Sequence, residues 1–174
     1  MDKILLHICC GVCSSWPVEK LRQDGYEVTG VFYNPNIQPI DEYERRLEAA
    51  RKACSIQGIE LIEAPYDSAN WLALTRGLEK EPEGGKRCAV CYRTRLEYTA
   101  SKAGELGIGR FTTTLSVSPH KDAVLINKIG KESGGAGFKE YNFKKEDGFK
   151  KANKFSLGQG LYRQNYCGCV YSRR

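Results

Sequence analysis

The residues best suited to chemistry in this chain of 174 residues are its eight cysteines. Seven of them form three short clusters: Cys9, Cys10 and Cys13; Cys88 and Cys91; Cys167 and Cys169. The eighth, Cys54, stands alone in a helical pattern, and we expect it to be a small core residue. Because cytosolic proteins of this size rarely keep structural disulfides, clustered cysteines indicate metal or redox chemistry.

The first two clusters offer the ligands of a metal site. Cys88 and Cys91 have the spacing with which two thiolates bind one metal ion or neighbouring irons of a cluster. With Cys9 and Cys10 they make four thiolates, which suit either structural zinc or an iron–sulfur cluster. Adjacent cysteines are unusual in zinc ribbons, and this favours the cluster. Cys13 is a fifth thiol, for which binding a second metal, supporting the site and simple packing all stay open.

The third cluster, Cys167-Gly168-Cys169, differs in kind. One intervening glycine brings the two sulfurs close enough for a disulfide in a small strained ring, and strain makes such a bond easy to reduce. We interpret these cysteines as a working redox pair, with two further metal ligands as the alternative. Tyrosines and arginines surround the pair in residues 162–166 and 171–174, a composition that suits stacking on bases and binding of phosphates.

The positive charge of the chain is concentrated at its end. Residues 139–174 hold nine Lys and Arg against three acidic residues, which accounts for the whole net charge of +6. A clustered positive field indicates a polyanionic partner, with a solvated basic tail as an equal alternative. No apolar run reaches the ~18 residues of a membrane span, and the first residues do not lead into a signal peptide, so we expect a cytoplasmic protein.

The elements that must position these residues follow an alternating pattern. Strands are expected at 5–8, 28–33, 59–64 and 111–115, and helices at 17–24, 39–57, 70–79, 93–106 and 122–132. Such alternation predicts a parallel α/β sheet in one domain, 1–174, with 139–174 as a basic C-terminal segment closing over the site. Ligands of such sheets lie beyond the carboxyl ends of the strands, where we expect residues 9–10, 34–36 and 116–120 to converge.

Five stretches, taken together and in order, resemble the cobalamin-independent epoxyqueuosine reductases, the QueH family. They are HICCGVCS at 7–14, YNPNI at 33–37, RCAVCY at 87–92, TTLSVSPHK at 113–121 and LYRQNYCGCVYS at 161–172. Each stretch is modest alone, but the ordered set spans nearly the whole chain. Gly11-Val12 departs from the Ala-Pro that is common in the family between these cysteines, which changes the stiffness of the loop and not its ligands.

The resemblance implies a fold, an activity, a cofactor and a partner. The family reduces epoxyqueuosine to queuosine at the wobble position of tRNAs with GUN anticodons (those for Tyr, His, Asp and Asn), the final step of queuosine biosynthesis. It uses a [4Fe–4S] cluster on a Rossmann-like fold related to the adenine-nucleotide α-hydrolases. Carried over to this chain, the implied cluster ligands are Cys9, Cys10, Cys88 and Cys91, and the implied redox-active disulfide joins Cys167 and Cys169.

The chemistry of epoxide removal assigns further roles. Turning an epoxide into an alkene needs two electrons, protons and an electrophile at the departing oxygen; a dithiol supplies two electrons, and a cluster passes them singly. We expect iron to polarise that oxygen, and a second iron near Cys10 or Cys13 stays open. A tyrosine, His120 or Lys121 would supply a proton, although His120 suits an orienting role in its loop equally well. His7 is interpreted as a satisfied core histidine, and the electron donor is not identified.

Two other functions compete with this one. A cluster-dependent tRNA sulfurtransferase of the same fold would carry an ATP phosphate loop after the first strand, but Cys10-Gly11-Val12-Cys13 has neither a glycine pair nor an Asp there. A non-enzymatic zinc-bound RNA-binding module would explain the basic segment and four thiols. It would leave Cys167 and Cys169 without a task.

Overall fold

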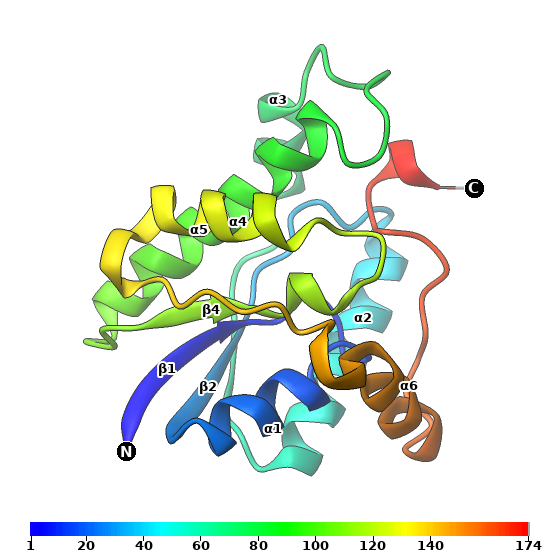
Figure 1. Cartoon of the computed structure of the whole chain (residues 1–174). Helices are drawn as coiled ribbons and strands as arrows, with labels where there is room; N and C mark the ends of the chain where they lie inside the picture. Colours follow the sequence, from blue (N-terminus) through cyan, green and yellow to red (C-terminus); the bar gives the residue numbers. More distant parts are fainter. Residues whose placement is uncertain (174) are drawn as a thin grey trace.

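The computed structural model describes residues 1–173, and its centre is a parallel sheet (Figure 1). The strands are β1 (Asp2–His7), β2 (Tyr26–Phe32), β3 (Leu61–Glu63) and β4 (Phe111–Thr113), in the order β3-β2-β1-β4. β1 pairs with β2 along its whole length, and its second half also pairs with β4, Leu5 lying opposite Phe111. The predicted parallel α/β fold is confirmed.

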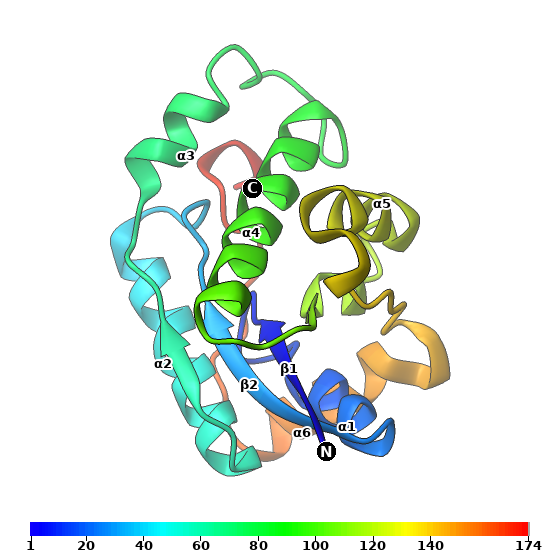
Figure 2. The ribbon, with the colours of Figure 1, turned by 90° about the vertical axis from the view of Figure 1, so that its left-hand side faces the viewer.

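Helices cover both faces of this sheet (Figure 2). They are α1 (Ser15–Gln23), α2 (Ile40–Gln57), α3 (Ser68–Leu74), α4 (Lys86–Glu105), α5 (Ala123–Gly134) and α6 (Gly148–Gly158). Side chains of a strand alternate between its faces. Ile4 and Leu6 of β1 therefore pack in a core with α1, α2 and α6, whereas Leu5 packs in a second core with α4 and α5. No helix of residues 1–173 is both long and apolar enough to cross a membrane.

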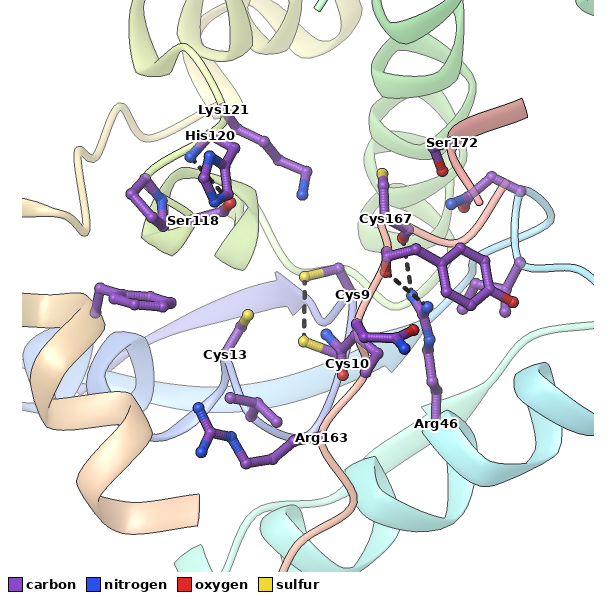
Figure 3. A pocket seen from close by; sticks show the side chains of 18 of the residues that line it. Cys9, Cys10, Cys13, Arg46, Ser118, His120, Lys121, Arg163, Cys167 and Ser172 are labelled. Atoms are coloured by element: carbon purple, nitrogen blue, oxygen red, sulfur yellow. Dashed lines mark hydrogen bonds between the residues drawn. The ribbon is translucent and has the colours of Figure 1, made fainter. Parts of the chain in front are cut away.

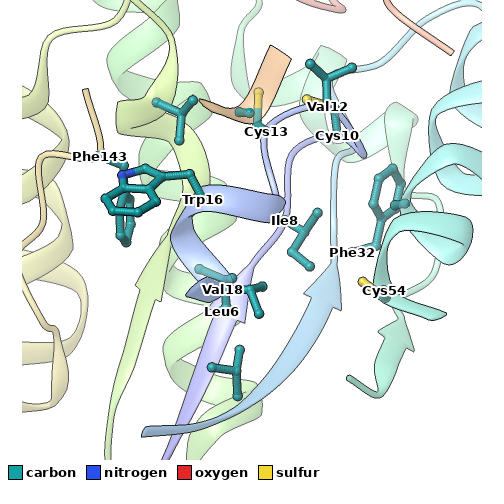
Figure 4. Close-up of a cluster of buried hydrophobic side chains, with 14 of the residues drawn as sticks. Leu6, Ile8, Cys10, Val12, Cys13, Trp16, Val18, Phe32, Cys54 and Phe143 are labelled. Carbon is teal, nitrogen blue, oxygen red and sulfur yellow. The ribbon is translucent and has the colours of Figure 1, made fainter. Parts of the chain in front are cut away.

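The first of these cores reaches the cysteine loop that follows β1 (Figure 4). Cys10 and Cys13 belong to the same buried cluster as Trp16 of α1. Gly11 allows the loop to lie directly on α2, because a Cβ at this position would meet the backbone of Ala49 at 2.6 Å. Packing therefore fixes the backbone that carries three of the thiols.

Two elements differ most from the sequence predictions, and in addition α3 ends at Leu74, where we expected a helix to residue 79. α4 begins at Lys86, not near residue 93, because the extended Gly85 ends the preceding loop and the helix starts at once. The C-x-x-C pair thus lies in the first turns of a helix. α6 was not predicted, because its buried face consists of the small residues Gly148, Ala152 and Ser156, which give little hydrophobic periodicity. A Cβ at Gly148 would collide with Phe143 O and with the Trp16 ring of α1, so this helix packs closely on its neighbours.

Candidate metal and redox site

A pocket of about 280 Å³ opens beyond the carboxyl ends of β1 and β2, where ligands of such sheets bind (Figure 3). Its walls come from the loops after β1, β2 and β4, from α6 and from the C-terminal segment. Four thiols line it, those of Cys9, Cys10, Cys13 and Cys167. The predicted convergence is confirmed, since residues 9–10, Asn36 and 118–120 all contribute to the lining.

Three of these thiols form a compact group. The sulfur atoms of Cys9, Cys10 and Cys13 all lie within 4.8 Å of one another, and those of Cys9 and Cys10 are 3.8 Å apart. Thr114, just after β4, fixes Cys9 twice: its Oγ1 accepts a hydrogen bond from Cys9 N–H at 3.1 Å and donates one to Cys9 Sγ at 3.2 Å. Clustered sulfur donors suit soft metals and iron–sulfur clusters.

Because the three thiols lie close together, their pKa values differ. Hydrogen bonds from Cys10 and then Cys13 lower the pKa of Cys9 well below its ordinary value. The bonds with Cys10 and Cys9, together with burial, raise the pKa of Cys13. At Cys10 the hydrogen bond with Cys13 lowers the pKa, but the bond with Cys9, burial and the Cys9 charge outweigh it and raise the pKa to about 12. Of the three thiols, Cys9 is therefore the first to lose its proton.

Cys88 and Cys91 lie one turn apart on the same side of α4. Gly84 N–H donates a hydrogen bond to Cys88 Sγ at 3.2 Å, and Arg95 Nη2 donates one to Cys91 Sγ at 3.2 Å. Burial raises the pKa of both thiols, which Gly84 N–H opposes at Cys88 and the Arg95 charge opposes at Cys91. Each of the two sulfurs thus accepts one hydrogen bond from the surrounding chain.

The two pairs of the predicted four-thiol site, one after β1 and one on α4, lie in neighbouring parts of the structure but do not form one compact group of sulfurs. Cys9 packs against the buried cluster of side chains that contains Cys88. Cys88 and Cys91 are nevertheless outside the compact group of three sulfurs. The ligand set inferred from the sequence therefore stays a prediction; it comprises Cys9, Cys10, Cys88 and Cys91.

Cys167 and Cys169 have different surroundings. Cys167 is partly buried and lines the pocket, whereas Cys169 is buried and packs with Trp71 and Cys91. Both are free thiols in this structure. One cysteine of the C-terminal pair thus lies in the pocket and the other packs against Cys91 of α4.

The two candidate proton donors, His120 and Lys121, lie in the loop after β4 and line the same pocket as Cys167 (Figure 3). His120 is exposed, and its backbone N–H donates a hydrogen bond to Ser118 Oγ at 3.3 Å. Lys121 is partly buried beside the thiols. Burial lowers the pKa of Lys121, but the neighbouring Cys167 and Cys9 outweigh it, and the net pKa is raised. Lys121 therefore stays protonated.

Two structural roles inferred from the sequence are confirmed. His7 is fully buried, and its Nδ1 and Nε2 lie 2.9 Å from Thr113 Oγ1 and 3.0 Å from Tyr33 O. Burial, with a smaller effect of Arg95, lowers its pKa to about 4, so it is neutral. Cys54 is 1% exposed in the core, and burial raises its pKa to about 12.

Sequence reasoning missed two buried arginines that line the pocket, Arg46 and Arg95. Arg95 follows Cys91 by four residues, so a helix over the C-x-x-C pair would have revealed that it faces the same way. Arg46 reaches carbonyl groups about 120 residues further along the chain. The spacing of residues along the sequence cannot predict a contact between such distant positions.

The family model described as epoxyqueuosine reductase QueH matches residues 4–174. The chain belongs to this family. The QueH protein of Streptococcus pyogenes is 39% identical over 180 residues, which cover 98% of this chain and 70% of the relative. That of Haemophilus influenzae is 40% identical, covering 99% and 72%, and that of Thermotoga maritima is 36% identical, covering 99% and 91%.

Membership of the QueH family makes the chain an oxidoreductase and favours this function over the sulfurtransferase and the zinc module. Among solved structures, the chain is similar to the U34-tRNA thiolase NcsA of Methanococcus maripaludis, solved with its [4Fe–4S] cluster. The TM-score is 0.58 at 17% identity, and the match covers 99% of this chain but 61% of the thiolase. This likeness supports the predicted Rossmann-like fold.

Proposed function

We propose that this member of the QueH family reduces epoxyqueuosine to queuosine in tRNA with an iron–sulfur cluster and the thiols of its C-terminal pair. The observation that carries the proposal is the meeting of Cys167 with Cys9, Cys10 and Cys13 in one pocket. These sulfurs come from opposite ends of the chain. A pocket with both metal-binding and redox-competent thiols suits a reductase.

The donor set fits an iron–sulfur cluster. Thiolates bring negative charge, and two cations face them: Arg95 donates a hydrogen bond to Cys91, and Lys121 lies near Cys9 and Cys167. Cys9, Cys10, Cys88 and Cys91 would hold the cluster, and Cys13 would then be the ligand left for the second iron that the sequence leaves open. When bound, a cluster supplies single electrons and an electrophilic iron.

The C-terminal thiols provide the electrons in pairs. Closing Cys167 and Cys169 to a disulfide releases two electrons and two protons. The epoxide takes these up as both of its C–O bonds break, a C=C bond forms, and the oxygen leaves as water. An external reductant, whose identity the sequence leaves open, then restores the dithiol. Lys121, which lines the pocket together with Cys9 and Cys167, would donate a proton to the departing oxygen, and His120 is the alternative donor on the same wall.

The mouth of the pocket suits an RNA nucleoside. Phe149 of α6 is 40% exposed and lines the pocket, where it offers an aromatic face for base stacking. Arg163 lines the same wall and donates a hydrogen bond to Asn153 Oδ1 at 3.0 Å. Together with the basic residues of 139–174, these groups support binding of tRNA by the segment that closes over the site, here tRNAs with GUN anticodons in the cytoplasm.

The test is a reduction assay under anaerobic conditions. Iron-reconstituted protein is incubated with epoxyqueuosine-containing tRNA and dithionite, and nucleosides are analysed by mass spectrometry. We expect loss of one oxygen atom with the native chain and with the control Cys54→Ala, and none with Cys88→Ala. Turnover by Cys88→Ala would contradict the ligand set, and a requirement for ATP would instead favour sulfur transfer.

A further inference from the structure

Arg46 of α2 is a buried cation with no role in the chemistry described above. Its side chain is 2% exposed, and its Nε donates a hydrogen bond at 2.8 Å to Oε1 of Glu42, which is 5% exposed. Its remaining fork points at the C-terminal segment: Nη1 donates to Cys167 O and Nη2 to Tyr166 O, each at 2.8 Å (Figure 3). Two of the charged donor groups of Arg46 therefore bind the backbone at the redox pair.

The carboxylate partner of Arg46 reinforces this connection. Tyr162 Oη donates to both oxygens of Glu42, at 2.9 and 2.7 Å. The Arg46 guanidinium also lies 5.0 Å from the centre of the Tyr166 ring, within cation–π range. One ion pair on α2 thus holds residues 162–167 through two hydroxyl contacts, two carbonyl contacts and one ring.

The backbone beyond Cys167 is clasped at the same place. Gln38 N–H donates to Gly168 O at 2.9 Å, and Val170 N–H donates to Gln38 Oε1 at 3.1 Å. Gly168 has φ +136°, and a Cβ there would lie 3.1 Å from both Arg46 Nη1 and Asn36 Nδ2. The glycine between the two cysteines is therefore needed for the close approach of Arg46.

We infer that Arg46 is a positioning residue that sets the geometry of the redox pair. It orients the carbonyls of residues 166 and 167 so that Cys167 faces the pocket, while Cys169 packs on Trp71 and Cys91. The planar fork of arginine contacts two carbonyls at once, and a lysine ammonium lacks this geometry. The inference rests on the proposed function of the pair and adds the group that holds it in place.

The experiment measures thiol accessibility and kinetics in the same cluster-loaded protein. Native chain, Arg46→Gln, Arg46→Lys and the control Arg51→Gln are treated with N-ethylmaleimide, and labelling of each cysteine is followed by mass spectrometry. Arg51 lies on the same helix in an exposed ion pair with Glu63. We expect Arg46→Gln and Arg46→Lys to raise the labelling rate of Cys169 at least about tenfold, because local opening exposes it. Cys54 stays protected in every variant.

The kinetic readout separates positioning from stability. Turnover number should fall about tenfold in both Arg46 variants with little change in KM for the tRNA, and Tyr162→Phe should show the same pattern at smaller amplitude. Unchanged labelling of Cys169, or equal gains at Cys169 and Cys54, would overturn the inference. Failure of the proposed function has a different signature: Cys167→Ser would retain full turnover whatever Arg46 does to labelling.

Discussion

The two thiol-bearing regions of the pocket are held in place by different forces. The Cys9–Cys13 loop is continuous with β1 and α1; Cys10 and Cys13 are part of the hydrophobic core, and Cys9 packs against it. The backbone of the C-terminal pair is held by hydrogen bonds from Arg46 and Gln38, and of its two cysteines only Cys169 packs in an apolar cluster, with Trp71 and Cys91. Packing gives the first region a fixed geometry, which suits permanent ligands. Polar anchoring gives the second a local and reversible attachment, which suits a pair that must open and close.

The substitution Cys167→Ser should separate the roles of the two regions most strongly. A serine cannot form the disulfide, so turnover should fall by at least about a thousandfold, while the core-anchored region keeps its iron. The measurements are single-turnover assays and the absorbance near 400 nm. Bleaching of the protein would show that Cys167 is a ligand, and the two regions would then share one role.

Gly168→Ala should have an intermediate effect. The added Cβ meets Arg46 and Asn36 in a backbone conformation that costs about 1–3 kcal/mol for other residues, so we expect turnover about tenfold lower. Gly160→Ala is the matched control, because Gly160 also has positive φ (+62°) but has no atom within 4 Å of its Cβ position. Equal losses in the two variants would show that backbone strain, and not the contact with Arg46, is responsible.

Phe149→Ala should have the smallest effect and should act on binding. Loss of one stacking partner costs about 1–3 kcal/mol, which raises KM for the tRNA by about fivefold or more and leaves the turnover number nearly unchanged. Phe149→Trp should restore binding. Leu157→Ala on the same helix is the control, because Leu157 is 63% exposed and does not line the pocket. A fall in turnover number without a change in KM would exclude the stacking role.

The sequence predicted the elements whose signals are local. The strand pattern predicted the strands of the parallel sheet. Together with the cysteine clusters it also predicted the edge where the pocket lies, because parallel strands end together. α6 escaped prediction because Gly148, Ala152 and Ser156 bury small side chains that carry no hydrophobic signal. The contact of Arg46 with Cys167 joins residues 121 positions apart, and only the folded chain brings them together.

The measurement that tests the central claim most directly is the iron and acid-labile sulfide content of anaerobically reconstituted protein. A cluster shared between the loop after β1 and helix α4 requires about four irons and four sulfides per native chain. Cys91→Ser and Cys10→Ser should both lose them, whereas Cys54→Ser should keep them. Native iron content in Cys91→Ser would contradict a cluster held between these two distant stretches of the chain.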